Sequence, residues 1–540
     1  MGRAPRTHLA DFTVNRRVVP ITLIACGIGA LCAFVALALL RMIALFTNLF
    51  YYGRFSVAAA TPATHHLGAW AVVIPAVGGL AVGIMARFGT DRIRGHGIPE
   101  AIEAILTRGS RVDLRVAILK PISAAVSIGS GGPFGAEGPI IMTGGAFGSL
   151  VAQRFNLTAA ERKTLLVAGA AAGMSATFAA PVAAALLAVE LLLFEWKPRS
   201  FIPVAAASAV AAALRPAVLG AGPLFPTPPL AAPPGGLTLA VCLPVGLAAG
   251  ALAALMTYAV YAAEDAFPML PIPWMWWPAV GGLVIGLGGL VSPHALGVGY
   301  DVIADLLAGS LVMKVAVALL VVKTLIWSIS LGSGTSGGVL APLLIVGASL
   351  GSLLAPMLPP EGAAFWPLVG MASILGAAMG VPLTAVVFAL ELTHDVDMLL
   401  PLLIAVVAAN AFTSLTLRRS ILTEKVDRKG FHLSREYATD PLELLFVADV
   451  MTPDAGAVVT APEAVIVHPD EPLTHAVNRM AERGCTTLAV VPRDEPGRVV
   501  GRVTLEQLLV ARSRHLEEER QRDGTVPLTA FMPPWLRDST

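Results

Sequence analysis

Charged residues are scarce in this chain: only 14% of its 540 residues are Asp, Glu, Lys or Arg, while 56% are hydrophobic. The 37 basic and 36 acidic residues leave a net charge of +1, which gives no indication of nucleic-acid binding. Such a composition is typical of a protein with several membrane-spanning helices. We therefore expect a lipid membrane as a partner and no nucleic acid.

Cysteine is also rare, with four residues in the whole chain. None of the four has the spacing of a metal ligand, and the first three lie in apolar stretches: Cys26, Cys32, Cys242 and Cys485. We expect small buried side chains at these positions, with neither disulfides nor a metal site. No other pattern points to a cofactor, so none is expected.

The segment Gly129–Pro139, with the sequence GSGGPFGAEGP, stands between two apolar pieces that are each too short to cross a membrane. Its one acid is Glu137, and a carboxylate at membrane depth usually marks an ion or proton path. Glycines let the backbone approach a ligand closely, and a helix that begins near Pro139 would point N–H groups back into the loop. The segment therefore predicts an anion site with a carboxylate beside it.

A second copy of this segment lies in the later half of the chain. Residues 120–152 align without a gap to residues 323–355, and residues 181–190 resemble residues 382–391. Two homologous halves, each with a helix broken at the same place, are typical of a transporter or channel. The binding site of such a protein lies where the two repeats meet.

Composition divides the chain into four parts. The polar, arginine-rich start is placed in the cytoplasm by the positive-inside rule. Near the end, strand and helix patterns alternate in the order β-α-β-β-α. We expect both termini on the cytoplasmic side of a cell (inner) membrane. The expected parts are a cytoplasmic N-terminus at 1–17, an all-α polytopic region with broken and re-entrant helices at 18–430, two inverted repeats within it at about 67–219 and 237–417, a small α/β domain at 440–515, and a charged tail at 516–540.

Three motifs resemble those of the CLC chloride channels and proton/chloride antiporters, and the resemblance covers roughly residues 18–430. The family's G-S-G-I-P corresponds to Gly95–Pro99 (GHGIP), and its G-R/K-E-G-P corresponds to Gly135–Pro139 (GAEGP). Its G-x-F-x-P corresponds to Gly338–Pro342 (GVLAP). The resemblance implies a homodimer with one anion pathway in each subunit, two inverted repeats, and helix N-termini that converge on chloride.

By this resemblance Glu137 is the gating glutamate, which blocks the anion site when ionised and swings aside when it is protonated or displaced by chloride. The role suits a carboxylate because it competes with chloride for the same N–H donors. The alternative interpretation is a carboxylate that only caps the helix at Pro139. The resemblance also implies a set of anion-binding residues: Gly95, His96, Gly97, Ile98, Gly138, Val339, Leu340 and Leu422.

Three positions depart from the family's pattern. His96 replaces the central serine, and either its imidazole donates to the anion or the N–H groups of Gly97 and Ile98 bind alone. Leu340 replaces a phenylalanine but keeps the backbone donor. Leu422 replaces the central tyrosine, so the central site is expected to lack one hydroxyl donor.

The inner proton-transfer acid of the family's antiporters falls on Leu191, next to Glu190, the first acid of the family's pair. Glu195 either substitutes for the missing acid or forms a plain ion pair with a nearby basic side chain. Lys120 matches a lysine that the family keeps before the gating loop. It either adds positive potential for anions or packs between helices.

These patterns favour transport of chloride and other small monovalent anions that is passive or weakly coupled to protons. A proton-coupled antiporter is the alternative. An intramembrane enzyme with Glu137 and His96 as acid and base is more remote, because the second copy of the loop at 332–342 has no acid. We therefore expect no enzymatic activity.

The end of the chain resembles a CBS domain. Asp449–Thr452 reads as the opening of one repeat, whereas residues 465–509 read as a single later repeat, so the first copy is expected to be truncated. The family's nucleotide-contacting pattern gives Thr504 and then Gln507 where an acid is usual. Nucleotide binding is therefore doubtful, and a scaffolding or dimer-stabilising role is favoured over a nucleotide receptor.

Overall fold

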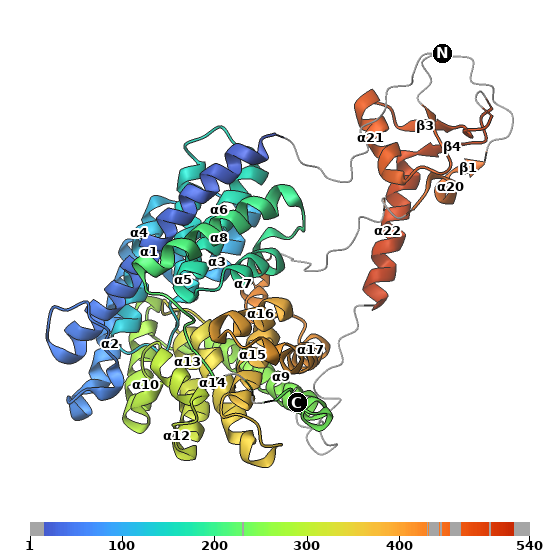
Figure 1. The fold of residues 1–540 in the computed structure, drawn as a ribbon. Helices are drawn as coiled ribbons and strands as arrows, with labels where there is room; N and C mark the ends of the chain where they lie inside the picture. The colour runs from blue at the N-terminus through green and yellow to red at the C-terminus, as the bar shows by residue number, and fades with distance from the viewer. Residues whose placement is uncertain are drawn as a thin grey trace. The chain divides into compact units, whose positions relative to one another are not determined.

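The computed structural model describes residues 16–228, 230, 232–428, 430, 442, 445–453, 466–495 and 498–522. The described residues divide into two compact units, one of residues 16–430 and one of residues 442–522. The first unit is helical and the second contains a sheet (Figure 1). Most of the expected N-terminal segment, and the charged tail beyond residue 522, lie outside the described residues.

The first half of the helical unit runs through eight α-helices with short 3-10 turns and one π-helical segment, η4. Its elements are α1 Val18–Tyr52, η1 Pro62–Thr64, η2 Gly68–Val72, α2 Val73–Phe88, η3 Asp91–Ile93, α3 Ile98–Thr107, α4 Leu114–Gly129, α5 Glu137–Ala152, α6 Ala159–Phe178, α7 Pro181–Leu187, η4 Ala188–Leu193 and α8 Pro198–Val218.

The second half repeats this plan with its own π-helical segment, η8. Its elements are α9 Gly236–Ala266, η5 Phe267–Met269, η6 Trp274–Trp276, α10 Trp277–Val291, η7 Pro293–Ala295, α11 Tyr300–Leu307, α12 Met313–Ala318, η8 Leu319–Lys323, α13 Thr324–Gly332, α14 Leu340–Leu354, η9 Ala355–Met357, α15 Phe365–Met379, α16 Pro382–Thr393, η10 Val396–Met398, α17 Leu399–Thr416 and α18 Thr423–Asp427.

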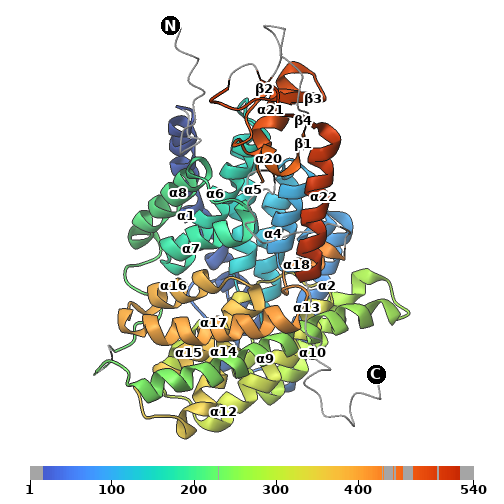
Figure 2. The ribbon, with the colours of Figure 1, turned by 90° about the vertical axis from the view of Figure 1, so that its right-hand side faces the viewer.

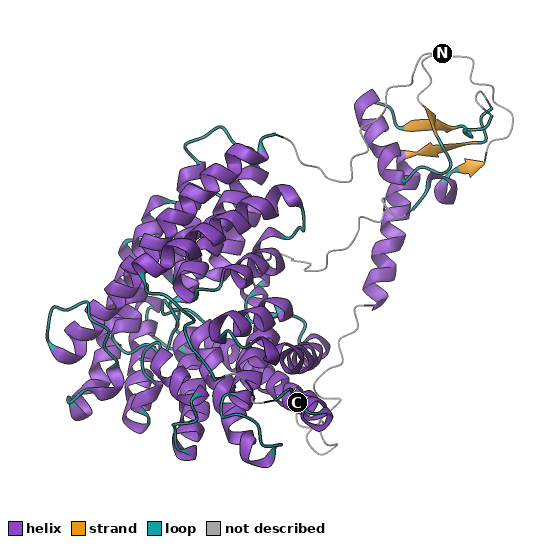
Figure 3. Ribbon diagram, in the orientation of Figure 1, coloured by secondary structure: helices purple, strands orange, loops and turns teal. Residues whose placement is uncertain are grey.

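Among the described residues, eight helical stretches are long and apolar enough to cross a membrane. They are Val18–Tyr52, Gly68–Phe88, Pro198–Val218, Gly236–Met269, Trp274–Val291, Met313–Gly332, Leu340–Met357 and Val396–Thr416. Three shorter apolar helices accompany them. The prediction of an all-α multi-pass membrane region is therefore confirmed, and in Figure 3 the described strands all lie in the second unit.

Helices α2 and α10 pack together with a reciprocity that defines the relation between the halves. A Cβ added at Gly79 would lie 2.1 Å from the carbonyl oxygen of Pro278, and one at Gly282 would lie 2.2 Å from that of Pro75. Gly282 and Pro278 follow Gly79 and Pro75 at one constant spacing. Each helix thus presents to the other the contact that it receives, which is the signature of a two-fold axis between repeats.

Helices α7 and α16 also pack together and exchange their N-terminal caps (Figures 1 and 2). The Glu190 carboxylate accepts the N–H groups of Leu383 at 3.2 Å and Thr384 at 2.8 Å, at the start of α16. The Glu391 carboxylate accepts those of Val182 and Ala183, at the start of α7. Each half therefore satisfies the first free amide groups of a helix in the other half.

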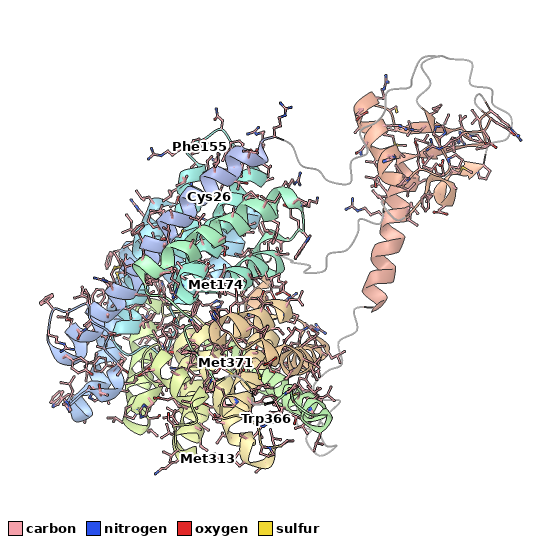
Figure 4. All side chains as sticks on the ribbon, viewed as in Figure 1. Cys26, Phe155, Met174, Met313, Trp366 and Met371 are labelled. Carbon is pink, nitrogen blue, oxygen red and sulfur yellow. The ribbon has the colours of Figure 1, made fainter. Side chains whose placement is uncertain are left out.

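The centre of the helical unit is made of helices that are buried nearly all round, as their apolar and Gly/Ala-rich sequences require. In Figure 4, Met174 of α6 and Met371 of α15 lie in the middle of this unit, and both are fully buried. Phe155 and Met313, which the same figure labels at opposite ends, are both exposed by comparison. Backbone breaks in the middle of such a unit are covered by protein, as a membrane interior requires.

The second unit holds a four-stranded sheet in the order β1-β4-β3-β2. Its elements are α20 Val447–Val450, β1 Thr452–Pro453, β2 Ile466–Val467, α21 Leu473–Arg483, β3 Thr487–Val490, β4 Gly501–Thr504 and α22 Leu505–Arg522. The predicted β-α-β-β-α order is confirmed by β2 to α22. Thr452, which was expected to belong to the opening of a first copy, pairs with Arg502 of the later repeat inside this one sheet.

Candidate functional site

Three glycine-rich loops meet in the interior of the helical unit, directly before the starts of α3, α5 and α14. Gly95 bridges to Ser336 in parallel fashion, and Gly135 bridges to Gly338 in antiparallel fashion. The N–H of Gly338 donates to the Gly135 carbonyl at 2.8 Å, and the reverse bond is 3.1 Å. Loops far apart in sequence are thus fastened backbone to backbone, and three helix N-termini converge.

The close approach depends on two missing side chains. A Cβ at Gly138 would lie 1.9 Å from the carbonyl oxygen of His96, and one at Gly97 would lie 2.6 Å from that of Gly138. Gly97 also has φ +92°, in the left-handed region that favours glycine. The sequence prediction that these residues come together at one place therefore agrees with the geometry.

The Glu137 side chain is fully buried at this meeting point. Its Oε2 faces the α-carbons of Gly135 and Gly338, where an added Cβ would lie 1.5 Å and 3.0 Å away. Oε2 makes no hydrogen bond within the described part of the chain. The backbone N–H groups of Glu137 itself and of Ala341, at the starts of α5 and α14, act on the carboxylate electrostatically. The carboxylate therefore occupies the position that an anion between these two helix ends would take.

Some of the expected backbone donors are already used. The N–H of Gly97 donates to Glu100 Oε2 at 2.8 Å, and that of Gly95 donates to the carbonyl of Thr335 at 3.0 Å. The first N–H groups inside α3 and α14, at Ile98 and Leu340, have no intrahelical acceptor. Of the expected donors, the N–H groups of Gly95 and Gly97 are therefore both used in structural bonds in this conformation.

His96 lies between these loops with only 3% of its surface exposed. Its Nδ1 is buried and has no hydrogen-bond partner among the described residues. The ammonium groups of Lys120 and Lys425 and the carboxylate of Glu100 act on the ring electrostatically. The buried ring therefore has one polar atom without a protein partner. This agrees with both interpretations of His96, since neither needs a bond between Nδ1 and the protein.

Lys120 serves the loop before α3. Its buried Nζ donates to the carbonyls of Ile93 at 2.9 Å and Gly95 at 2.8 Å. In the second half, the Nζ of Lys323 donates to the carbonyl of Gly297 at 3.2 Å, and it acts electrostatically on Glu137. Both lysines thus combine a structural bond with positive charge beside the site.

Leu422 is fully buried immediately before α18. Lys425 of α18 forms an ion pair with Glu100 of α3 at 2.9 Å, which ties this helix to the site. The hydroxyl of Tyr261, on α9, donates to the carbonyl of Ile421 at 2.5 Å. Leu422 brings no hydroxyl to this turn. The Tyr261 hydroxyl, from another helix, instead bonds the backbone of the turn and does not reach the site.

The two candidate inner acids are engaged elsewhere in this conformation. Glu190 caps α16 across the two-fold axis. Glu195 accepts the Ser200 hydroxyl at 2.5 Å and forms ion pairs with Lys163 at 3.3 Å and Arg199 at 3.5 Å. The ion-pair interpretation of Glu195 agrees with these contacts, and neither acid hydrogen-bonds to Glu137.

Tyr300 is a site residue that the sequence reasoning missed. Its hydroxyl donates to Glu137 Oε1 at 3.1 Å from the start of α11. The signal was present in the sequence, because Gly297-Val-Gly-Tyr300 repeats Gly95-His-Gly-Ile98 in the second half. Both pairs of glycines have positive φ angles. The two loops are alike without being identical, because ψ is −38° at Gly97 and 33° at Gly299.

A charged cavity of about 470 Å³ opens beside the Glu100–Lys425 ion pair. Its walls carry both signs of charge, and the charged lining residues are Asp91, Arg92, Arg94, Glu100, Glu103, Arg108, Arg111, Glu264 and Lys425. The guanidinium of Arg94 lies 4.8 Å from the ring centroid of Trp274, which holds it in place. Two of its lining residues, Arg94 and Glu100, flank the Gly95 loop in sequence.

Comparison with known proteins agrees with this architecture of two inverted repeats around a site at helix ends. The family model described as voltage gated chloride channel matches residues 77–414, and the CBS domain model matches residues 447–514. The chain therefore belongs to the voltage gated chloride channel family and carries a CBS domain. It is 32% identical over 356 residues to the voltage-gated ClC-type chloride channel ClcB of Salmonella typhimurium, over 64% of this chain and 84% of the relative. It is 30% identical over 409 residues to ClcB of Escherichia coli strain SMS-3-5, over 74% and 97%.

Solved structures show the same fold. A slow cyanobacterial Cl⁻/H⁺ antiporter superimposes with a TM-score of 0.67 at 21% identity, over 77% of this chain and 99% of that one. A CLC-type fluoride/proton antiporter superimposes with a TM-score of 0.62 at 19% identity, over 74% and 97%. The antiporter structures are related in fold, and their transport chemistry is a property of those proteins.

Proposed function

We propose that the chain transports chloride, and other small monovalent anions, across the inner membrane of a bacterial-type cell through a pathway gated by Glu137. One observation carries the proposal: a buried carboxylate lies between the N-termini of α5 and α14, with one oxygen that has no hydrogen bond among the described residues. Chloride competes with the ionised carboxylate for this place. The relatives named ClcB support chloride as the substrate.

The proposed pathway is passive or weakly coupled to protons. Glu190 caps a helix and Glu195 is held in ion pairs, so the role of an inner proton acceptor is left unfilled by both candidates. The second candidate function is proton-coupled antiport, which the antiporter structures with the same fold favour. We further propose a homodimer, with both termini in the cytoplasm and no nucleotide on the CBS domain.

The decisive experiment is reconstitution into liposomes with chloride and proton flux measured together. The Glu137→Gln variant removes the charge but keeps the shape of the side chain, so the site stays open at every pH. We expect chloride flux at neutral pH to be preserved or raised, activation by acid to be lost, and any uphill proton movement to stop. Loss of chloride flux in a folded, dimeric variant would show that Glu137 is not a gate.

The same liposomes test selectivity and coupling. The site offers helix N-termini to the ion and has no dedicated polar pocket for a small, strongly hydrated one, so chloride flux should exceed fluoride flux. Fluoride flux above chloride flux contradicts the proposed substrate. Uphill proton transport by the wild type establishes the antiport alternative and requires a proton route past Leu191.

Transport is proposed in preference to catalysis on the same geometry. An acid–base enzyme would need His96 and Glu137 to act on one substrate atom. In the structure, Glu137 is instead bonded to Tyr300 and lies over two glycines that give its carboxylate room.

A further inference from the structure

Tyr300 is held rigidly at the start of α11. Its ring packs edge-on against Phe178, with centroids 6.0 Å apart at 86°, and lies 6.3 Å from the ring of Phe225. Gly297 and Gly299, directly before it, have φ angles of +66° and +79° and set the direction in which the helix begins. The hydroxyl is therefore aimed by packing on both sides of the ring, before any hydrogen bond is counted.

The hydroxyl reaches the gate from the opposite half of the molecule. It donates to Glu137 Oε1 at 3.1 Å, while Oε2 points over Gly135 and Gly338 toward the helix ends. Bonds from a neutral donor to an ionised acceptor are stronger than neutral pairs, and burial strengthens them further. One oxygen of the carboxylate is thus fastened to Tyr300, and the other is left to compete with an anion.

We infer that Tyr300 is the latch of the gate: its hydroxyl holds the ionised Glu137 carboxylate in the blocking position and so sets how readily acid or chloride opens the pathway. The inference rests on the proposed function of Glu137. Tyr300 is a positioning residue, since it acts on the ion only through the carboxylate. The proposed gate then has two residues, Glu137 in the first repeat and Tyr300 in the second.

The latch predicts the sign of two effects. A hydroxyl that donates to Oε1 favours the ionised, blocking form over the protonated one. Its removal should move the pH of half-maximal chloride flux upward. It should also let chloride displace the carboxylate at a lower concentration, so flux at neutral pH rises as well.

Tyr300→Phe tests this, because it removes the hydroxyl and keeps the ring that packs on Phe178. A hydrogen bond to a charged group corresponds to about a tenfold change in an equilibrium, so we expect the half-activation point to move up by about one pH unit. The matched control is Tyr52→Phe, since the Tyr52 hydroxyl donates to the Thr61 carbonyl at 2.7 Å, outside the three glycine-rich loops. The control should keep the wild-type pH profile.

A double-mutant cycle separates the latch from the gate. In the Glu137→Gln background, Tyr300→Phe should change neither flux nor its pH dependence. If Tyr300→Phe alone leaves the half-activation point unchanged while Glu137→Gln abolishes activation, the latch is wrong and the gate stands. If Glu137→Gln keeps activation by acid, the gate itself is wrong.

A second variant keeps the test decisive if Tyr300→Phe does not yield folded protein. 3-Fluorotyrosine at position 300 preserves the ring and makes the hydroxyl a stronger donor. The half-activation point should then move downward, opposite to the effect of phenylalanine. An unchanged profile with fluorotyrosine overturns the latch.

Discussion

The two halves of the helical unit share a frame and differ in what they place on it. Gly95, Gly97, Gly135 and Lys120 have counterparts at Gly297, Gly299, Gly338 and Lys323. The position of Glu137, however, holds Leu340 in the second half, and the position of Ile98 holds Tyr300. The duplicated glycines and lysines build the loops, whereas Glu137, the proposed gate, and Tyr300, the proposed latch, are each present in one half only. The residues that shape the backbone of the site are thus shared by both halves, whereas its acidic and hydroxyl side chains come from positions where the halves differ.

The largest effect is expected where the halves differ by one methyl group. Gly138 corresponds to Ala341, and a Cβ at Gly138 would strike the His96 carbonyl, which is backbone and cannot move aside. We expect Gly138→Ala to abolish chloride flux and to destabilise the protein by at least about 1–3 kcal/mol. Liposome flux and thermal unfolding in detergent measure both effects.

The reciprocal change, Ala341→Gly, is the control for that prediction. Ala341 already carries its Cβ without conflict, so its removal should cost no more than about 1 kcal/mol and leave transport in place. Equal losses for the two variants would show that the halves are not distinguished at this position.

Removing either of the two exchanged helix caps should destabilise the protein by a similar amount. Glu190→Ala leaves the amides of Leu383 and Thr384 without their acceptor, and Glu391→Ala does the same to Val182 and Ala183. We expect each to lower the free energy of unfolding by about 1–3 kcal/mol, with Glu190→Ala the larger because it also loses the Thr384 hydroxyl. Thermal unfolding measures the loss.

Chloride and proton flux provide a second measurement on the Glu190→Ala variant. Flux per folded molecule, and any proton coupling, should be unchanged, since the carboxylate only caps a helix. Glu195→Ala serves as the control for transport. Its carboxylate is partly buried, accepts the Ser200 hydroxyl and pairs with Lys163 and Arg199, so its loss should lower the free energy of unfolding by about 1–3 kcal/mol and leave flux per folded molecule unchanged. A specific loss of proton movement in Glu190→Ala would restore that residue to the proton path.

A smaller effect is expected at His96, whose counterpart is Val298. The ammonium groups of Lys120 and Lys425 oppose a further positive charge on the ring, and only Glu100 favours it. We therefore expect His96→Ser to keep the pH dependence of flux between about pH 5 and 8, the range where histidine titrates. Val298→Ser is the matched control in the other half, and a flattened profile in His96→Ser alone would assign the pH response to the imidazole.

The smallest effect is expected outside both halves. Truncation after Gly430 removes the CBS domain and should leave chloride flux per folded molecule unchanged, although the yield of dimer should fall. In the CBS domain, the amide side chain of Gln507 accepts the N–H of Thr504 at 2.8 Å and donates to Thr452, so its polar atoms are already engaged. Adenosine nucleotide should alter transport in neither protein; a response of the full chain alone would reveal a nucleotide site.

The frame was predictable from sequence because glycine and proline mark the breaks in both halves at equal spacing. The loops around Glu137 and Gly338 were found in this way. Tyr300 was missed because its loop is offset by one residue from the alignment of residues 120–152 with 323–355, and tyrosine does not resemble isoleucine. The role of Glu190 needed the structure, since a cap supplied by a helix in the other half leaves no local pattern.

The hydrogen bond of the Gly97 N–H could be predicted from the sequence only in part. This N–H is taken by the Glu100 side chain, three residues later, which is the half of a capping box that the third helical residue supplies. Glycine has no side chain for the other half, so the sequence showed only part of the usual pattern.

The exchanged caps also determine when during synthesis the first half can complete its structure. The N-terminus of α7 is completed by Glu391, which leaves the ribosome about 200 residues later, or roughly 10–40 s at ordinary rates of synthesis. During that interval the amides of Val182 and Ala183 lie without their final acceptor in a chain that is entering lipid. The first half is therefore a dependent intermediate, and two halves made as separate chains should become stable only when both are present in the same membrane.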